Sequence, residues 1–599
     1  MARWSALLFL AFASVTGTES RAPGVSYAIR IDPAHLDVAV ITMRVEGVPA
    51  ITRFAMKVHP EYDAKYWRYL DPITVNGTLD DRVARIERAD STLWRLRIPG
   101  GRGTIHYRVH IQAPAGAQRR AWMPFSRETG ALINPPDFLL YLPDAVNAPA
   151  RVSLDVPPAW RVATALAREG HEWLAPDAAT LLDSPLLLGD WHTWSFVERG
   201  STFHVVYWPL PDARPFDTVA FVDGFHRLST AALDVFRQAT GRDFWFLIQD
   251  GAGDALEHRT SVTIGVPSLD LARNPHAHIT EIAHEFFHAW NLVVIHPDRY
   301  GELSFQPLTP TSGLWWGEGV TLHYADVLAR RGGVADSLPP RVEHLRNLLQ
   351  SYAGAWWRGT VSPERASLAF GTFPSLNPDA TGGYYLQGEL LANALDAAIE
   401  DSSHGARGLD DLMREMLRIS AGGHGFTGAE LERTASSVCG CDLRNFFATQ
   451  VRGAAPIDLA PALRRVGLVA SIDTAVATDD HAVPLPDLRI APDFARAGPP
   501  VYLIVSPLSH WYGAGLRSGD RVVALQRTAA TAPDSVNHVL RRLHIGDTAV
   551  VAVERDGQTV DIRVPVTSYL RPRVRFAEDP AATVEQRARL MRWARGASN

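Results

Sequence analysis

The run Ile279-Thr-Glu-Ile-Ala-His-Glu-Phe-Phe-His-Ala-Trp-Asn-Leu-Val-Val294 decides the fold of the centre of this 599-residue chain. Its apolar residues recur every three or four positions, which predicts a helix over Ile279–Val294 with one buried face. Residues four apart share a helix face, so His284 and His288 can direct ring nitrogens at one metal ion. Glu285 would lie beside that ion and take a proton from water. The pattern predicts a hydrolytic zinc site on a helix.

A catalytic zinc site of this kind needs a third protein ligand. The best candidate is Glu318, which starts a predicted helical segment thirty positions beyond His288. The glycines on either side of it allow the backbone to approach a neighbour closely. His296 and His323 are rival ligands, but a histidine in a loop before proline or on a helix is more often solvated or packed.

The composition is that of a folded globular protein. Hydrophobic residues make up 46% and charged residues 21%, and the formal net charge is −6. A dedicated nucleic-acid binder is therefore not expected, because it needs a basic excess to contact phosphates. The two cysteines, Cys439 and Cys441, are too few for a disulfide framework, and they predict a local disulfide or two buried thiols rather than a metal site.

The first 22 residues have the pattern of a secretory signal. Arg3 supplies a positive charge, Trp4–Val15 is apolar, and small residues follow. The apolar run is too short to cross a bilayer, and no other stretch of the chain is long enough. We expect an exported protein, periplasmic or secreted, with no transmembrane span; the cleavage site stays open.

The rest of the chain divides into segments with different hydrophobic patterns. Residues 23–197 alternate apolar and polar positions and predict an all-β sandwich or saddle domain. Residues 198–455 are mainly helical, 456–485 read as a linker, 486–567 as a small β-rich module, and 568–599 as a C-terminal tail with a short helix. The helices expected in the central part are Asp217–Gln238, Ile279–Val294, Val320–Arg331, Val342–Tyr352, Tyr384–Ile399 and Leu409–Ile419.

Five motifs in one order resemble the glycyl aminopeptidase family of bacterial zinc metallopeptidases. They are His284-Glu-Phe-Phe-His-Ala-Trp-Asn291, Trp316-Gly-Glu-Gly-Val-Thr-Leu-His-Tyr324, Leu256-Glu-His-Arg-Thr-Ser261, Tyr384-Tyr-Leu-Gln-Gly-Glu-Leu390, and Asp442-Leu-Arg-Asn-Phe-Phe447 with Val451-Arg-Gly453. The resemblance covers nearly the whole chain after the signal. It implies a gluzincin: a β-rich N-terminal domain, a mainly α, thermolysin-like (α+β) catalytic domain, and a β-rich PDZ domain.

The resemblance also implies roles for single residues. His284, His288 and Glu318 would bind one Zn²⁺ per chain, and Glu285 would be the general base. Tyr385 would hydrogen-bond the oxyanion, although Tyr384 is its immediate rival. Glu257, with its neighbour His258, would bind the substrate's free α-amine.

Substrates would be peptides with a free N-terminus and a small first residue such as Gly or Ala. Asp254-Ala255 stands where the family carries two glycines.

The segment Val501–Val566 resembles a PDZ core, with its carboxylate-binding loop expected near Leu488-Arg489-Ile490. A PDZ domain can receive a peptide C-terminus by strand addition. Two other functions stay open. A zinc endopeptidase would use the same metal without the amine contact, and a non-catalytic scaffold would act through its PDZ domain alone.

Overall fold

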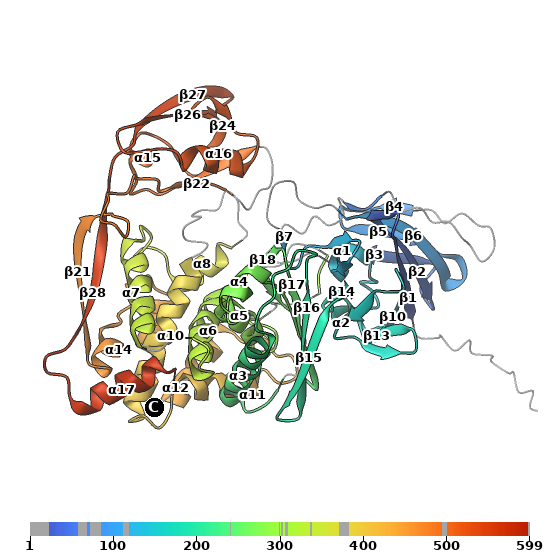
Figure 1. Cartoon of the computed structure of the whole chain (residues 1–599), viewed down its shortest axis with the longest axis horizontal. Helices are drawn as coiled ribbons and strands as arrows, with labels where there is room; N and C mark the ends of the chain where they lie inside the picture. The colour runs from blue at the N-terminus through green and yellow to red at the C-terminus, as the bar shows by residue number, and fades with distance from the viewer. Residues whose placement is uncertain are drawn as a thin grey trace, which may run out of the picture.

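The computed structural model describes residues 23–57, 69–71, 86–111, 119–239, 241–298, 300, 303–305, 310–335, 338–370, 383–493 and 500–596. The expected signal, residues 1–22, lies outside this set, so export stays a prediction. In the described part, no helix is both long and apolar enough to cross a membrane. Figure 1 shows a β domain, a helical centre and a β-rich module joined in chain order.

The N-terminal domain is built from sheets, as the alternating pattern predicts. Its largest sheet has the strand order β12-β13-β10-β1-β2-β6. Along β1, alternate residues from Val25 to Ile31 are buried, so one face of the sheet packs on the core. The strands are β1 (Gly24–Asp32), β2 (His35–Glu46), β6 (Arg102–His110), β10 (Ala150–Asp155), β12 (Ala167–Glu169) and β13 (Glu172–Ala175).

Two smaller sheets complete this domain. One has the order β11-β14-β9-β8 and the other β3-β5-β4. Their strands are β3 (Ile51–Ala55), β4 (Ile86–Arg88), β5 (Leu93–Arg97), β8 (Phe125–Arg127), β9 (Gly130–Ile133), β11 (Arg161–Ala163) and β14 (Leu186–Gly189). Short helix α2 (Ala178–Leu182) lies between β13 and β14.

The central domain begins with a five-stranded sheet of order β15-β16-β17-β20-β19. Strand β15 starts at His192, a few residues before the boundary expected at 197, because it pairs with β16 rather than with the first domain. The strands are β15 (His192–Glu198), β16 (Ser201–Trp208), β17 (Asp243–Gln249), β19 (Ala255–Glu257) and β20 (Ser261–Gly265). Short β19 forms one edge of the sheet.

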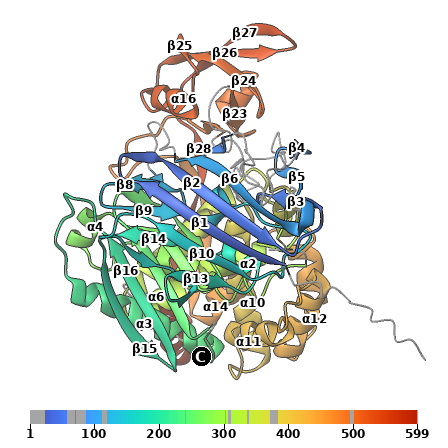
Figure 2. The same cartoon turned by 90° about the vertical axis from the view of Figure 1, so that its right-hand side faces the viewer.

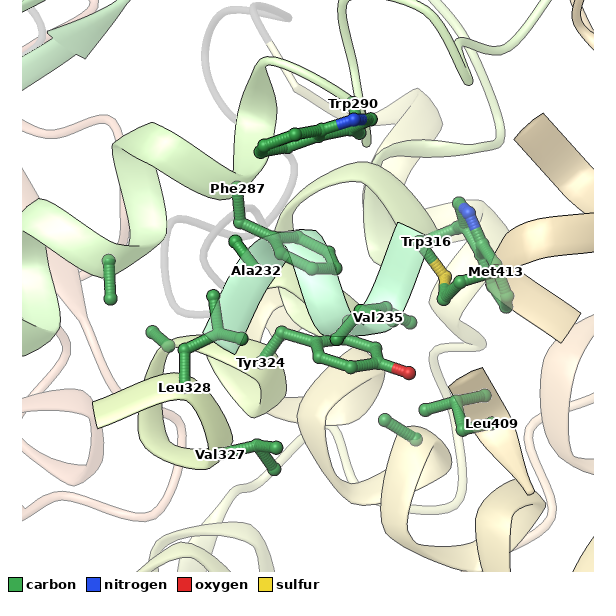
Figure 3. Packing of buried hydrophobic residues seen from close by; sticks show 14 of the residues in the cluster. Ala232, Val235, Phe287, Trp290, Trp316, Tyr324, Val327, Leu328, Leu409 and Met413 are labelled. Carbon is green, nitrogen blue, oxygen red and sulfur yellow. The ribbon is translucent and has the colours of Figure 1, made fainter. Parts of the chain in front are cut away.

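Helices pack against this sheet and against one another. They are α3 (Thr218–Phe236), α5 (Ile279–His288), α6 (Thr321–Arg331), α7 (Leu338–Gly354), α10 (Gly383–Ser402), α11 (Leu409–Ile419) and α12 (Gly428–Cys439). Phe286 of α5 packs against Phe244 and Phe246 of β17, with ring centroids 4.9 and 5.2 Å apart. On another side of α5, Phe287 stacks on Tyr324 of α6 at 4.4 Å (Figure 3). Both faces therefore fix α5 in the core.

Helix α5 is shorter than the sequence predicts. It ends at His288, not at Val294, and turns follow. Leu292 has a φ of 135°, a conformation that a helix cannot contain. The apolar periodicity continues past the true end because Trp290 and Ile295 are buried in the turns as well.

The expected linker and tail form one ordered ribbon. Strand β21 (Leu468–Val476) from the linker pairs antiparallel with β28 (Leu570–Glu578) from the tail. Short helices α14 (Ala460–Arg465) and α17 (Val584–Ala594) flank it, and the C-terminal module stands at its end (Figures 1 and 2). The pairing joins strands about a hundred residues apart, which local patterns do not reveal.

The C-terminal module has a sheet of order β22-β23-β24-β26-β27 with α16 (Pro533–Leu540) beside it. Its strands are β22 (Ile490–Pro492), β23 (Val501–Val505), β24 (Arg521–Leu525), β26 (Thr548–Arg555) and β27 (Gln558–Pro565). In the central domain, Cys439 and Cys441 form a disulfide at the end of α12, which decides between the two alternatives that the sequence leaves open.

Candidate metal centre

Three side chains converge on one point between α5 and the turn that precedes α6. The Nε2 atoms of His284 and His288 lie 2.9 Å apart. Oε2 of Glu318 lies 3.3 Å from each of them. Glu318 belongs to a π-helical turn, Trp315–Val320, which continues into α6. Among the described residues, this is the group of His, Cys, Asp and Glu side chains arranged to bind a metal ion.

The hydrogen bonds of His288 show which of its ring nitrogens can bind a metal ion. Its Nδ1 lies 2.9 Å from the backbone oxygen of Asn291, and a carbonyl can only accept, so Nδ1 carries a proton. In its neutral form, His288 therefore presents a lone pair at Nε2. Oε2 of Glu318 is buried and accepts no hydrogen bond from the described residues. Two imidazole nitrogens and a carboxylate oxygen that accepts no hydrogen bond fit Zn²⁺, which prefers such ligands.

Electrostatics at this point also favour a cation. Burial lowers the pKa of His288, but the carboxylates of Glu318, Glu257 and Glu285 together outweigh burial and raise that pKa to about 10. Burial raises the pKa of Glu318, yet the neighbouring histidines outweigh it and hold the pKa below the usual range. Each shift has the same physical cause, an attraction between a buried carboxylate and positive charge. A bound metal cation would satisfy that attraction.

A close contact between two glycines brings α10 to this centre. A β-carbon on Gly319 would lie 2.4 Å from Cα of Gly388, and one on Gly388 would lie 2.0 Å from the Trp315 oxygen. The Glu318 turn and α10 therefore touch backbone to backbone. Gly319 has the role that the sequence suggested for the glycines beside Glu318, whereas its partner Gly388 was not singled out.

The two tyrosines at the start of α10 have different surroundings. The ring of Tyr385 lies 6.4 Å from the ring of His284. Tyr384 is buried in the core and packs edge-on against Phe370 at 6.1 Å. The rings of the two tyrosines stack at 4.7 Å, and the Tyr385 ring is the one that also lies beside His284. The geometry favours Tyr385.

Two further carboxylates border the centre. Glu285 follows His284 on α5, and Glu257 ends the edge strand β19, which packs against α5. Burial raises the pKa of Glu285 well above its usual value, and Glu257 and Glu318 add to the effect. Burial and Glu318 likewise raise the pKa of Glu257, while His288 lowers it. Like charges this close disfavour ionisation of all three carboxylates at once, so a cation at this point would stabilise their charged forms.

His258 lies beside Glu257 but is buried. Its Nδ1 lies 3.4 Å from Oδ1 of Asp183, and the backbone N–H of Arg259 donates to Oδ2 of Asp183 at 2.8 Å. Asp183 follows α2 in the N-terminal domain. The sequence grouped His258 with substrate binding and did not identify Asp183. No local signal marks Asp183, because it meets His258 from 75 positions earlier in the chain.

Asp254 explains how the chain tolerates the loss of a glycine. Its φ is 56°, in the left-handed region where glycine is favoured and aspartate is better tolerated than most residues. Its side chain lies 3.5 Å from Nε of Arg120, which belongs to β7 (Arg119–Arg120) of the N-terminal domain. The N-terminal domain thus contacts both ends of β19.

The rival ligands lie elsewhere. His323 is buried beside a cavity of about 50 Å³ that Arg341 also lines, and burial and Arg341 lower its pKa to about 3. Nδ1 of His296 lies 2.9 Å from the Pro297 oxygen. The structure brings neither into the group that contains Glu318.

In the C-terminal module, the carboxylate of Asp487 lies in the loop that precedes edge strand β22. Asp487 is fully buried and accepts hydrogen bonds from the Arg489 guanidinium at 2.8 and 2.9 Å. The His510 backbone N–H also donates to it at 2.9 Å. The carboxylate-binding loop is expected near these residues, at Leu488-Arg489-Ile490, and that role stays a prediction.

Comparison with known families agrees with this architecture. The M61 peptidase N-terminal domain matches residues 64–190, the M61 glycyl aminopeptidase domain matches 278–391, and a PDZ domain matches 501–566. No curated protein matches the chain.

The chain is similar to solved structures to different degrees. A protein from Idiomarina loihiensis, described as of the aminopeptidase N family, is 20% identical, with a TM-score of 0.73 over 95% of this chain and all of that one. An M1 zinc metallopeptidase from Deinococcus radiodurans is 14% identical, with a TM-score of 0.44 over 73% of this chain and 96% of its own. At 20% identity, the likeness to the Idiomarina loihiensis protein concerns the fold alone.

Proposed function

We propose that this zinc metallopeptidase, which carries the N-terminal and catalytic domains of the M61 glycyl aminopeptidase family, removes small N-terminal residues from peptides. The observation that carries the proposal is the convergence of His284, His288 and Glu318 on one point. These three side chains would bind one Zn²⁺ per chain. In this proposal, Glu285, Tyr385 and Glu257 act on the substrate around that point.

When bound, zinc lowers the pKa of a coordinated water to about 7 and polarises the scissile carbonyl. Glu285 would accept a proton from the attacking water as the water oxygen bonds to the carbonyl carbon. Tyr385 donates a hydrogen bond to the oxygen on which negative charge develops. Glu285 then gives its proton to the leaving amine, so the C–N bond breaks and one water is consumed.

Glu257 makes the reaction an aminopeptidase reaction in this proposal. Its half-buried carboxylate lies close enough to His288 and Glu318 for their charges to shift its pKa. A buried carboxylate is stabilised by a charged partner, and the α-ammonium of a peptide is one. Pairing that ammonium with Glu257 beside the metal would place the first peptide bond at the zinc.

The test is hydrolysis of aminoacyl-arylamides and of matching N-acetylated peptides, with and without a metal chelator. We expect cleavage of free-amine substrates only, fastest for Gly and Ala, abolished by chelator and restored by Zn²⁺. Glu257→Gln should lower kcat/KM for these substrates by about 10²-fold, since truncating a buried charge pair costs 2–5 kcal/mol.

Two other results would replace the proposal. Cleavage of acetylated peptides at a rate that Glu257→Gln does not change would identify an endopeptidase. No cleavage of either class, with no zinc bound after purification without chelator, would identify a scaffold that acts through its PDZ domain.

Asp183 provides a prediction about the N-terminal domain. Asp183→Ala should raise KM for aminoacyl-arylamides about fivefold, because a lost hydrogen bond of about 1 kcal/mol loosens the residues that follow Glu257. The zinc content should not change. Asp144→Ala, which removes an exposed ion pair with Arg53 in the same domain, is the matched control and should leave KM unaltered. Equal KM values for the two variants would contradict the role of Asp183.

We also propose that the protein is exported. The support is the signal-like pattern of Met1–Ala22 together with the disulfide between Cys439 and Cys441, since disulfides persist in oxidising compartments. The PDZ domain would add a peptide C-terminus to its sheet at edge strand β22, beside α16.

A further inference from the structure

One buried residue bridges the two segments that carry the metal-facing side chains. Asn291 is fully buried in the turn after α5. Its side-chain nitrogen donates to the Trp316 oxygen and to Oγ1 of Thr321, each at 3.0 Å, and lies 3.3 Å from the Gly317 oxygen. Those three groups surround Glu318. The amide orientation follows from the acceptors, because two of them are carbonyls that cannot donate.

The backbone of Asn291 contacts the other segment. Its carbonyl accepts the Nδ1–H of His288 at 2.9 Å, which fixes both the tautomer and the ring orientation of that histidine. A single residue thus holds His288 through its main chain and the Glu318 turn through its side chain.

The turn around Asn291 has an unfavourable conformation. Leu292 has a φ of 135°, where residues with a β-carbon are strained. Its Cδ1 would lie 2.7 Å from a β-carbon on Gly317, so the turn also packs closely against the Glu318 segment. Oδ1 of Asn291 is buried and has no hydrogen-bond partner in the described part of the chain. A leucine would fill this space without an unpaired oxygen, so space filling alone does not account for asparagine.

We propose that Asn291 is a positioning residue that sets the distance and angle between His288 and Glu318 before the metal binds. The inference rests on the proposed function, because it assumes that these side chains bind zinc. Its consequence is a preorganised site: removing the amide would free the Glu318 turn, and zinc would then have to order it on binding. Outer contacts of this kind change metal affinity by about 10- to 100-fold.

The experiment uses metal-free full-length protein and measures zinc affinity by competition with a chromophoric chelator. Asn291→Asp keeps the shape but points an oxygen at the Trp316 and Gly317 carbonyls, and Asn291→Ala removes the amide. We expect each to bind zinc about 10- to 100-fold more weakly than the unchanged protein. The visible spectrum of the Co²⁺-loaded protein should also change, since it reports ligand geometry rather than general stability.

The matched control is Asn134→Ala. Asn134 is also a buried asparagine, and its side-chain nitrogen donates to Oδ2 of Asp137 at 2.7 Å, but it lies in the N-terminal domain. This variant should keep the zinc affinity and the cobalt spectrum of the unchanged protein, even if its thermal midpoint falls.

Zinc affinity and cobalt spectra unchanged in folded Asn291 variants would overturn the inference. If neither variant folds, Thr321→Val tests the inference instead, because it removes the hydroxyl that accepts a hydrogen bond from Asn291. A several-fold loss of zinc affinity in this variant supports the positioning role of Asn291, and an unchanged affinity refutes it. Failure of the unchanged protein to bind zinc would instead reject the proposed function, and the inference with it.

Discussion

Replacing Glu285 with Gln is expected to lower kcat for aminoacyl-arylamides by about 10²- to 10⁴-fold, the usual contribution of a general base. An amide has nearly the shape of the carboxylate but cannot accept the proton from water at neutral pH. The zinc ligands are unchanged, so elemental analysis should still give the metal content of the unchanged protein. Steady-state kinetics and zinc content measured on the same preparation check both parts.

Glu281→Gln is the matched control for Glu285. Glu281 lies one turn earlier on α5, where its carboxylate is 3.1 Å from Nδ1 of His278. The same chemical change on the same helix should leave kcat within about twofold, because exposed ion pairs contribute little. Turnover that survives in Glu285→Gln, or falls equally in both variants, would remove Glu285 from the mechanism.

Gly388→Ala is expected to have the largest effect on stability. The new β-carbon would lie 2.0 Å from the Trp315 oxygen, a backbone atom that cannot rotate away, so α10 must move off the Glu318 turn. Overpacking of this kind costs about 1–3 kcal/mol, and backbone clashes lie at the upper end. The displacement should also separate Tyr385 from His284 and loosen the packing that fixes the position of Glu318. We therefore expect a lower free energy of unfolding together with weaker zinc binding and a lower kcat/KM.

Gly513→Ala is the control for this substitution. Gly513 ends α15 (His510–Gly513) in the PDZ domain, and a β-carbon there meets nothing within 4 Å. This variant should unfold at the same denaturant concentration as the unchanged protein, or at a slightly higher one. Gly388→Ala with unaltered stability and zinc affinity would show that α10 and the Glu318 turn can separate without consequence.

Much of the architecture could be predicted from local patterns. Alternation along β1 predicts a half-buried strand, and the three- and four-residue spacing around Phe286 predicts a buried helix. Motif order gave the family, and the catalytic and PDZ domain matches confirm it. The end of α5 was predicted wrongly, since the apolar pattern runs past His288 while Leu292 leaves the helical conformation.

The sequence alone determined which chemistry is available. Helix geometry places His284 and His288 on one face because they are four positions apart, and Glu285 necessarily follows beside them. These relations span one helical turn, so they hold wherever the helix forms. The secondary-structure pattern and the donor set of a zinc site follow from such short-range rules.

The sequence named Glu318 as the best candidate for the third ligand, but only the tertiary structure brings it to the histidines. Only the tertiary structure also shows that Gly388 allows close contact between α10 and the Glu318 turn, and that Asp183 contacts His258 from another domain. Asn291 connects His288 to the Glu318 turn by contacts that no spacing rule predicts. The physical reason is that close packing and buried hydrogen bonds depend on the distances between segments, which are set by the whole core and not by neighbours in the chain.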